Sequence, residues 1–294
     1  NLFLNAKSKI QKLKDSKWFL DTEIKRWVDD IEVISGKDIK KLENEPIFLY
    51  KDILSVIKSI NNKLELRGRD SLGISIQICL KNTNNLSLLK SYIKKNNTNS
   101  QNEIIFNKEE KIINFTYKTY NRVGALGENA AIIINLIKSD KILNKIICLD
   151  LSNSAIIVAH TRWASVGEVN IENTHPIISK KKCNKSNLTW FGSILNGDIY
   201  NYRDYLETSK NTIFEKNCTT DCLAISNTLI DKNNINHEDL KKTIKYFTGS
   251  YVIGTFNSNK NNALNIFKQG TQGLYLGFSE DKIMFASDVY GLIE

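Results

Sequence analysis

Apolar residues in the first fifth of the chain recur at helical spacing. Between residues 10 and 31 they lie three or four positions apart, which is the spacing of one face of an α-helix, and Gly36 follows where such a helix would end. A second run with this spacing covers 53–64, and Gly68 lies just beyond it. The pattern predicts two helices whose apolar faces are both buried in a core.

From Gly73 onward the period changes to two. Ile74 and Ile76 alternate with Ser75 and Gln77, which is typical of a half-buried strand. Further strands are predicted at 112–117, 155–159, 190–195, 251–256, 265–268, 274–277 and 282–286, helices at 125–137, 200–207, 221–229 and 240–247, and Asn-rich surface loops at 96–102, 180–187, 231–236 and 257–262. Because strands and helices come in blocks, an α+β layered sandwich is favoured over a doubly wound parallel sheet.

The composition is that of a folded globular protein. The chain has 294 residues, of which 41% are hydrophobic, with only 14 glycines and 2 prolines. This length is at the upper limit for one hydrophobic core, so we expect one large domain with an appendage, or two domains. No apolar run approaches the ~20 residues that cross a bilayer, and no secretory signal opens the chain, so we expect no membrane partner and a cytoplasmic location.

Charge and cysteine content narrow the functional classes further. There are 41 Lys plus Arg against 32 Asp plus Glu, which gives a net charge of +9. The Lys pairs and triplets are short, scattered and flanked by Asn rather than by aromatic residues that stack on bases, so they indicate a solvated surface and no nucleic-acid partner. Five cysteines without a CxxC pair, and only three histidines, indicate reduced thiols and no metal site; no cofactor is expected either.

Four short segments place polar residues where a strand ends or a helix begins, so that side chains and backbone can converge on a pocket. They are 64–71 (LELRGRDS), 160–167 (HTRWASVG), 195–202 (LNGDIYNY) and 219–221 (TTD). Arg162 is either a bidentate partner for a carboxylate or a buried arginine paired with a structural acid. Asp221 opens a predicted helix, so it is either a capping residue or a counter-charge for an ammonium group. Together the two would hold both charges of an amino acid.

The other polar candidates also have two interpretations. Asn196-Gly197 is a common hairpin-turn sequence, but an Asn amide and a Gly backbone N–H are also suitable donors to an oxyanion. His160 and His175 are interpreted as structural histidines, because no serine or cysteine forms an obvious relay with them. Cys218 and Cys222 are interpreted as small core residues.

Taken in order, these segments resemble the class II glutamine amidotransferase domain, and most closely the glutaminase half of glutamine:fructose-6-phosphate aminotransferase. The resemblance covers about residues 64–292 and includes 249–254 (GSYVIG) and 286–288 (ASD). It implies an N-terminal-nucleophile hydrolase fold, which is a four-layer αββα sandwich of antiparallel sheets. Residues 63–294 would form this domain, and 1–62 would be a helical insertion or appendage.

The resemblance also implies roles for particular residues. In this family the arginine at the position of Arg162 binds the glutamine carboxylate, and Trp163 and Ser165 line the pocket. Asn196 and Gly197 fall on the oxyanion hole, Asp221 falls on the aspartate that holds the substrate ammonium, and Arg67 falls on an arginine that shapes the nucleophile site. Glutamine needs such a set of groups because it is a zwitterion with a side-chain amide.

Two departures from the family pattern affect these expectations. The family begins with Cys-Gly-Ile on a strand, and its terminal cysteine is the nucleophile, whose own α-amino group serves as the base. Here Asn1 begins a helical region, so we expect the nucleophile and first strand to lie upstream; the alternative is a catalytically inactive protein. In addition, Val166 stands where the family usually has a histidine, which affects the polarity of the pocket edge.

The resemblance implies a domain that hydrolyses L-glutamine and passes ammonia to a downstream sugar-isomerase domain acting on fructose 6-phosphate, within a homo-oligomer. The glutaminase domains of amidophosphoribosyltransferase and asparagine synthetase are alternatives. A glutamine-binding regulatory module without turnover is another alternative, and an RNA-binding protein is a weaker one.

Overall fold

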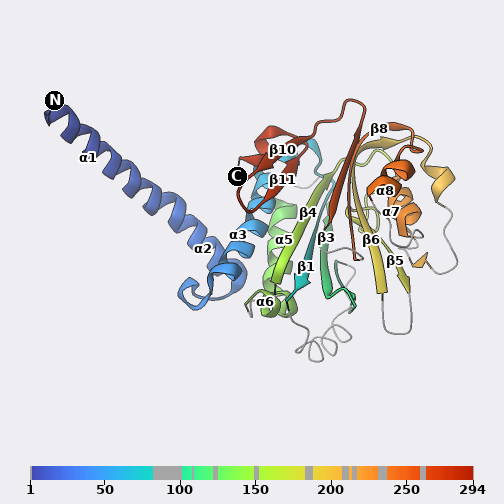
Figure 1. The fold of residues 1–294 in the computed structure, drawn as a ribbon, viewed down its shortest axis with the longest axis horizontal. Coiled ribbons are helices and arrows are strands. Elements are labelled where there is room, and N and C mark those ends of the chain that lie inside the picture. Colours follow the sequence, from blue (N-terminus) through green and yellow to red (C-terminus); the bar gives the residue numbers. More distant parts are fainter. Residues whose placement is uncertain are drawn as a thin grey trace.

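The chain folds into four layers, helix, sheet, sheet and helix, with a long helical arm at the N-terminus (Figure 1). The computed structural model describes residues 2–81, 101–107, 109–121, 125–148, 152–182, 188–206, 212–213, 217–230, 237–258 and 263–293. Every strand pairing found in these residues is antiparallel. The predicted α+β class and the αββα sandwich of antiparallel sheets are therefore confirmed.

The helices are α1 (Leu2–Phe19), α2 (Lys25–Ser35), α3 (Asn44–Ser59), α5 (Glu128–Ser139), α6 (Lys141–Cys148), α7 (Cys222–Ile230) and α8 (His237–Ile244), and a π-helical turn, η1 (Leu20–Ile24), joins α1 to α2. The strands are β1 (Ser71–Leu80), β2 (Asn102–Asn107), β3 (Ile112–Tyr120), β4 (Ser152–Arg162), β5 (Ile177–Lys182), β6 (Leu188–Ile199), β7 (Thr212–Ile213), β8 (Gly249–Asn257), β9 (Leu264–Gln269), β10 (Tyr275–Phe278) and β11 (Ile283–Ala286). One sheet has the order β2-β3-β1-β4 and the other β7-β5-β6-β8-β9, while β10 and β11 form a separate hairpin.

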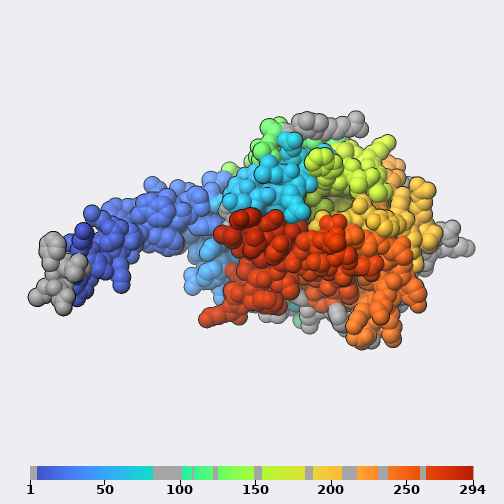
Figure 2. Space-filling model, turned by 90° about the horizontal axis from the view of Figure 1, so that it is seen from above, coloured from blue at the N-terminus to red at the C-terminus, as the bar shows by residue number. Residues whose placement is uncertain are grey.

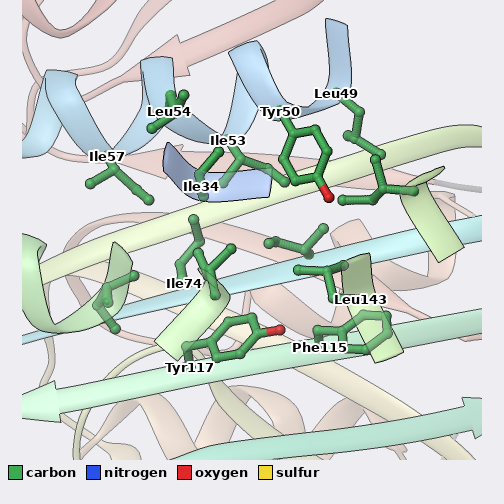
Figure 3. Packing of buried hydrophobic residues seen from close by; sticks show 14 of the residues in the cluster. Ile34, Leu49, Tyr50, Ile53, Leu54, Ile57, Ile74, Phe115, Tyr117 and Leu143 are labelled. Atoms are coloured by element: carbon green, nitrogen blue, oxygen red, sulfur yellow. The ribbon is translucent and has the colours of Figure 1, made fainter. Parts of the chain in front are cut away.

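The first helical layer, made of α3, α5 and α6, packs on the outer face of the first sheet (Figure 3). Ile53 of α3 and Ile74 of β1 are fully buried in this layer. Burying one such side chain stabilises the fold by about 1.5–3 kcal/mol. The hydroxyl of the buried Tyr117 donates to Asp140 Oδ2 over 2.9 Å, so the one polar atom of that side chain is satisfied.

The two sheets pack face to face, and β1 is buried along its whole length rather than on one face. The prediction of a half-buried strand is therefore wrong. The isoleucines of β1 face the helices, whereas Ser75 and Gln77 lie on the face that packs on the second sheet. There Ser75 Oγ donates to Asn114 Oδ1 of the neighbouring strand β3 (2.6 Å), and Gln77 Oε1 accepts from Trp190 Nε1 of β6 in the second sheet (3.0 Å). The alternating pattern arises because the two buried faces differ in chemistry.

The second helical layer, made of α7 and α8, covers the outer face of the second sheet (Figure 1). Leu223 and Ile225 of α7 pack there with Leu195 of β6 and Ile253 of β8. This packing fixes the start of α7 beside the end of β6, where two of the candidate segments lie.

Some elements were not expected from the sequence. They are β2, β5, β7 and α6. In the predicted helix at 200–207, the described residues 200–206 contain a 3-10 turn at Tyr202–Tyr205 instead. The sequence predicts a loop at 180–187, but residues 180–182 belong to β5, where Lys180 forms an ion pair with Glu103 of β2. The remainder of the predicted loops, at 96–100, 183–187, 231–236 and 259–262, lies outside the described residues.

The expectation that both N-terminal apolar stripes are buried is only half right. α3 and the end of α2 are buried in the first core, where Ile31 and Ile34 are at most 3% exposed, whereas Leu13 and Leu20 are 70% and 58% exposed. The part of 1–62 that stands away from the body is thus the arm formed by α1, η1 and the start of α2 (Figure 2). Whether 1–62 is an insertion as a whole stays a prediction. No helix among the described residues has the length and apolarity needed to cross a membrane.

Candidate active site

Hydrogen bonds join the candidate segments at the ends of β4 and β6. Asp70 donates its backbone N–H to Arg162 O (3.1 Å), and its Oδ2 accepts from Ala164 N (2.9 Å). Ser165 Oγ donates to Asp198 Oδ1 over 2.8 Å, which ties the loop after β4 to β6. Segments 64–71, 160–167 and 195–202 therefore meet in one region, as the sequence predicts.

The guanidinium of Arg162, the last residue of β4, is buried with 4% of the residue exposed. Two of its five N–H groups donate to backbone carbonyls of the loop that follows, at Val166 and at Glu168 (3.1 Å). Burial lowers the pKa of Arg162, and nearby Asp221 opposes that shift. The partners of this guanidinium are therefore loop carbonyls, and not the structural acid that one interpretation of Arg162 proposes. Val166 takes part through its backbone carbonyl, so this contact does not depend on its side chain.

Asp221 lies immediately before α7 and is buried, with 4% exposed. Its Oδ2 accepts from Ile199 N (2.9 Å), and its Oδ1 accepts from Cys222 N (3.0 Å) and from Thr220 Oγ1 (3.2 Å). Burial raises the pKa of this carboxyl, and the N–H of Ile199 opposes the shift. Asp221 therefore anchors the helix start to β6, as one of its two interpretations required. Its negative charge also favours the protonated form of Arg162.

Asn196 and Gly197 lie within β6 rather than in a hairpin turn, opposite Val252 and Tyr251 of β8. The hairpin interpretation is therefore excluded. The Nδ2 of Asn196 is buried, and among the described residues it has no hydrogen-bond partner. An unsatisfied buried donor of this kind lowers the free energy of unfolding by about 1–3 kcal/mol. Gly197 has a φ of 106°, and a Cβ there would lie 2.1 Å from Ser250 O, so only glycine fits.

The remaining predicted site residues lie at the margin of this region. Trp163 is 71% exposed. Ser165 is also exposed, but its hydroxyl donates a hydrogen bond to Asp198. Arg67 closes the turn Glu65–Arg67 and turns toward the C-terminal segment, where it donates to Ser287 O (3.3 Å) and lies 3.6 Å from Asp288 Oδ2. Its neighbour Gly68 packs on the backbone of Arg162. The role of Arg67 in shaping the nucleophile site stays a prediction.

A further organising residue, Asn173, carried no sequence signal. Its side chain is fully buried, its Oδ1 accepts from Thr219 N (2.6 Å) and Thr220 N (3.0 Å), and its Nδ2 donates to Glu168 O (3.0 Å). Asn173 thus ties the loop that surrounds Arg162 to the segment that carries Asp221. An isolated asparagine in a loop looks like any turn residue, so only the fold reveals this role.

Two histidine rings that contact each other lie next to this region. The ring centroids of His160 and His175 are 4.6 Å apart, both Nδ1 atoms are buried, and His175 Nε2 lies 3.4 Å from Thr220 Oγ1. Burial lowers the pKa of His160 to about 4 and lowers that of His175 well below its usual range. Both rings are neutral at pH 7, which agrees with a structural role. Neither ring therefore carries a charge that could bind a charged group of a substrate.

We expect the stability of the protein to fall in mild acid because of these histidines. The folded-state pKa of His160 is about 4, below the ordinary 6.5, so the unfolded chain binds the proton more readily and stability is lost as pH falls from about 6.5 toward 4. At pH 5 His160 alone accounts for about 2 kcal/mol. Urea unfolding at pH 7.5 and pH 5 measures the difference. The variants His160→Gln and His175→Gln should each show a smaller loss, and an unchanged loss in the double variant would contradict the assignment.

Metal and thiol chemistry have little support in this region. Among the described residues, no group of three or more His, Cys, Asp or Glu side chains could hold a metal ion. Cys79, Cys148, Cys218 and Cys222 take part in no disulfide bond. Burial raises the pKa of the Cys222 thiol, which keeps it protonated and poorly nucleophilic. Cys183 lies outside the described residues.

Comparison with known proteins confirms the resemblance seen in the motifs. The chain is 30% identical over 138 residues to a glutamine–fructose-6-phosphate aminotransferase (isomerizing) of Aquifex aeolicus, covering 46% of this chain and 22% of that protein. It is 24% identical over 248 residues to the enzyme of that name from Buchnera aphidicola, covering 83% of this chain and 31% of that protein. The chain thus spans less than a third of the length of these relatives. No family model matches it.

Among solved structures, the chain is similar to an allosteric regulatory enzyme of purine biosynthesis. That structure aligns with a TM-score of 0.49 at 15% sequence identity, covering 82% of this chain and 40% of that one.

Proposed function

We propose that this chain is the glutamine-hydrolysing domain of an aminotransferase. The observation that carries the proposal is the buried, unpartnered Nδ2 of Asn196, a hydrogen-bond donor held in the strand whose end contacts Asp221 and Ser165. A donor kept free at such a cost is suited to a substrate oxygen that develops negative charge. The name of the relatives indicates glutamine as the nitrogen source and fructose 6-phosphate as the acceptor.

The charges of the site match a free amino acid. In the proposed complex Arg162 binds the α-carboxylate through N–H groups that are not used by the loop, and Asp221 accepts from the α-ammonium group. The side-chain amide carbonyl then faces Asn196 Nδ2 and the N–H of Gly197. Trp163 and Ser165 border the substrate. Both charged groups are buried in the resting protein, so each attraction acts at lower dielectric than at the surface.

The nucleophile in this proposal is a terminal cysteine from outside the 294 residues. The cysteine's α-amino group takes the thiol proton as the sulfur forms a bond to the amide carbon. It then passes that proton to the amide nitrogen, the C–N bond breaks, and the nitrogen leaves as ammonia. Water then hydrolyses the thioester and releases glutamate. The α-amino group has an ordinary pKa of ~7.7–8.0, so it can serve as the base near neutral pH.

Ammonia release from amide-labelled glutamine tests this proposal. The full-length protein should release labelled ammonium, a variant with its terminal cysteine replaced by alanine should not, and the 294-residue chain alone should be inactive. Turnover by the chain alone would contradict the assignment of the nucleophile. Glutamine binding without turnover by the full-length protein would favour a regulatory module.

The acceptor is the least constrained part of the proposal. Amidophosphoribosyltransferase and asparagine synthetase also use glutaminase domains of this class, so ammonia transfer should be assayed with fructose 6-phosphate first and with the other acceptors as controls. We also propose a cytoplasmic location and a homo-oligomer. No nucleic-acid or membrane partner is part of the proposal.

A further inference from the structure

Asp198 carries a carboxylate that the proposed complex leaves without a role. It lies in β6, two residues after Asn196. Side chains two residues apart on a strand lie on the same face of the sheet. Ile194 packs between the two sheets, whereas Leu195 and Ile199 pack in the core beneath α7 on the other face. The side chain of Asp198 therefore lies on the face of β6 that carries Asn196 and is directed toward the first sheet.

One oxygen of the Asp198 carboxylate is free to accept a hydrogen bond from a ligand. The other oxygen, Oδ1, accepts from Ser165 Oγ over 2.8 Å. Oδ2 has no hydrogen-bond or ion-pair partner among the residues that the structure describes. Because the residue is only half-buried, a solute can reach this oxygen.

The carboxylate of Asp221 has little capacity left for an ammonium group. Three protein groups already donate to it, which are the N–H groups of Ile199 and Cys222 and the hydroxyl of Thr220. An ionised carboxylate offers about four lone-pair sites, whereas an ammonium group brings three N–H donors. Asp221 can therefore satisfy about one of these donors, and the others need a further acceptor.

The position of Asp198 along β6 matches the length of glutamine. Residues of an antiparallel strand advance by ~3.4 Å each, so Asp198 lies about 7 Å beyond Asn196. The amide carbon and the α-nitrogen of glutamine are four bonds apart, roughly 5 Å in an extended conformation. Asp221 fixes the direction, because it binds the N–H of Ile199, the next residue along the strand. A substrate whose amide carbonyl faces Asn196 thus brings its ammonium group to the level of Asp198.

The two carboxylates also interact electrostatically. Burial is the main cause that raises the pKa of Asp221, and the negative charge of Asp198 raises it further. The two negative charges therefore repel each other in the resting protein. An ammonium group between them relieves this repulsion, so the pair favours a ligand that is positively charged at this point.

We infer that Asp198 is a second binding residue for the α-ammonium group of the substrate, which lies between Asp198 and Asp221. Asp198 Oδ2 accepts from the N–H groups that Asp221 leaves unsatisfied, while Ser165 holds the carboxylate in place through Oδ1. Asp198 thereby selects amides that carry an α-amino group over amides that lack one. This inference rests on the proposed function, because it adds a residue to the same glutamine site.

Calorimetric titration with L-glutamine and with glutaramic acid, which has no ammonium group, tests the inference. Asp198→Asn keeps the shape of the side chain and an oxygen that accepts from Ser165, so it removes the charge alone. We expect this variant of the 294-residue chain to lower the preference for L-glutamine over glutaramic acid by about 10-fold. The loss should fall on L-glutamine. It should be smaller than that in Asp221→Asn, because the charge of the half-buried Asp198 is more strongly screened by water.

Two control variants separate the charge of Asp198 from its contact with the loop. Ser165→Ala removes the hydrogen bond but keeps the carboxylate, so it should weaken both ligands by a similar factor. Asp204→Asn removes a negative charge from the exposed face of the turn Tyr202–Tyr205 and should leave the preference unchanged.

The outcomes distinguish this inference from the proposed function. An Asp198→Asn variant that keeps the full preference, or a Ser165→Ala variant that lowers it equally, would overturn the inference alone. A wild-type chain that binds neither ligand would overturn the proposed function and this inference with it.

Discussion

Replacing Asn196 with alanine in the full-length protein is expected to lower the rate of ammonia release from glutamine by about 100- to 1,000-fold. The side-chain donor has no partner among the described residues of the resting protein. Its removal should therefore raise the free energy of the transition state, in which the substrate oxygen becomes negative. The effect should therefore fall on kcat, with little change in KM. Initial rates over a range of glutamine concentrations separate the two constants.

Stability provides the control for this variant. Truncating an unsatisfied buried donor removes a desolvation penalty, so the thermal midpoint of Asn196→Ala should stay the same or rise. Asn196→Asp keeps the shape but replaces the donor by an acceptor, and it should be at least as inactive. A strong loss of stability with only a mild loss of kcat would show that Asn196 is structural.

Arg162→Lys is expected to weaken glutamine use by about 10- to 150-fold, the equivalent of a charge-assisted hydrogen-bonded pair worth roughly 1.5–3 kcal/mol. Lysine keeps the positive charge but cannot bind a carboxylate bidentately. The change should appear in KM and in the dissociation constant of glutamine. Kinetics at low glutamine concentration measure it.

The same variant tests whether Arg162 acts only on its own loop. The guanidinium donates to the carbonyls of Val166 and Glu168, so Arg162→Lys should also lower the free energy of unfolding. Asn173→Ala disturbs that loop from another side and serves as the comparison. If both variants impair glutamine use equally, the role of Arg162 is to hold the loop.

The sequence predicted most of the elements because apolar periodicity reports what a segment packs against. It could not report how many faces are buried. β1 looks half-buried, yet its polar face lies against the second sheet, and its polar side chains bond to Asn114 of the neighbouring strand β3 and to Trp190 of the second sheet. The stripe of α1 looks like core, yet it projects from the body. In both cases the apolar periodicity shows correctly that the segment is amphipathic, but it does not show which surface the segment packs against.

For the site, the ordered motifs predicted the convergence that hydrogen bonds then displayed at Asp70, Ser165 and Asp221. Local signals were less reliable. The Asn196-Gly197 pair forms no turn but lies within β6. There the glycine allows the close approach of β8. Asn173 was not identified because its contacts are to residues distant in sequence. Contacts that only the fold creates leave no local pattern to detect.

The binding of matched glutamine analogues tests most directly whether Arg162 and Asp221 hold the two charges of glutamine. Calorimetric titration should compare L-glutamine with glutaramic acid, which lacks the ammonium group, and with 4-aminobutanamide, which lacks the carboxylate. We predict that the wild-type chain prefers L-glutamine to both, that Asp221→Asn abolishes only the preference over glutaramic acid, and that Arg162→Lys abolishes only the preference over 4-aminobutanamide. Equal weakening of all three ligands by both variants, or no binding of L-glutamine to the wild-type chain, would contradict the claim.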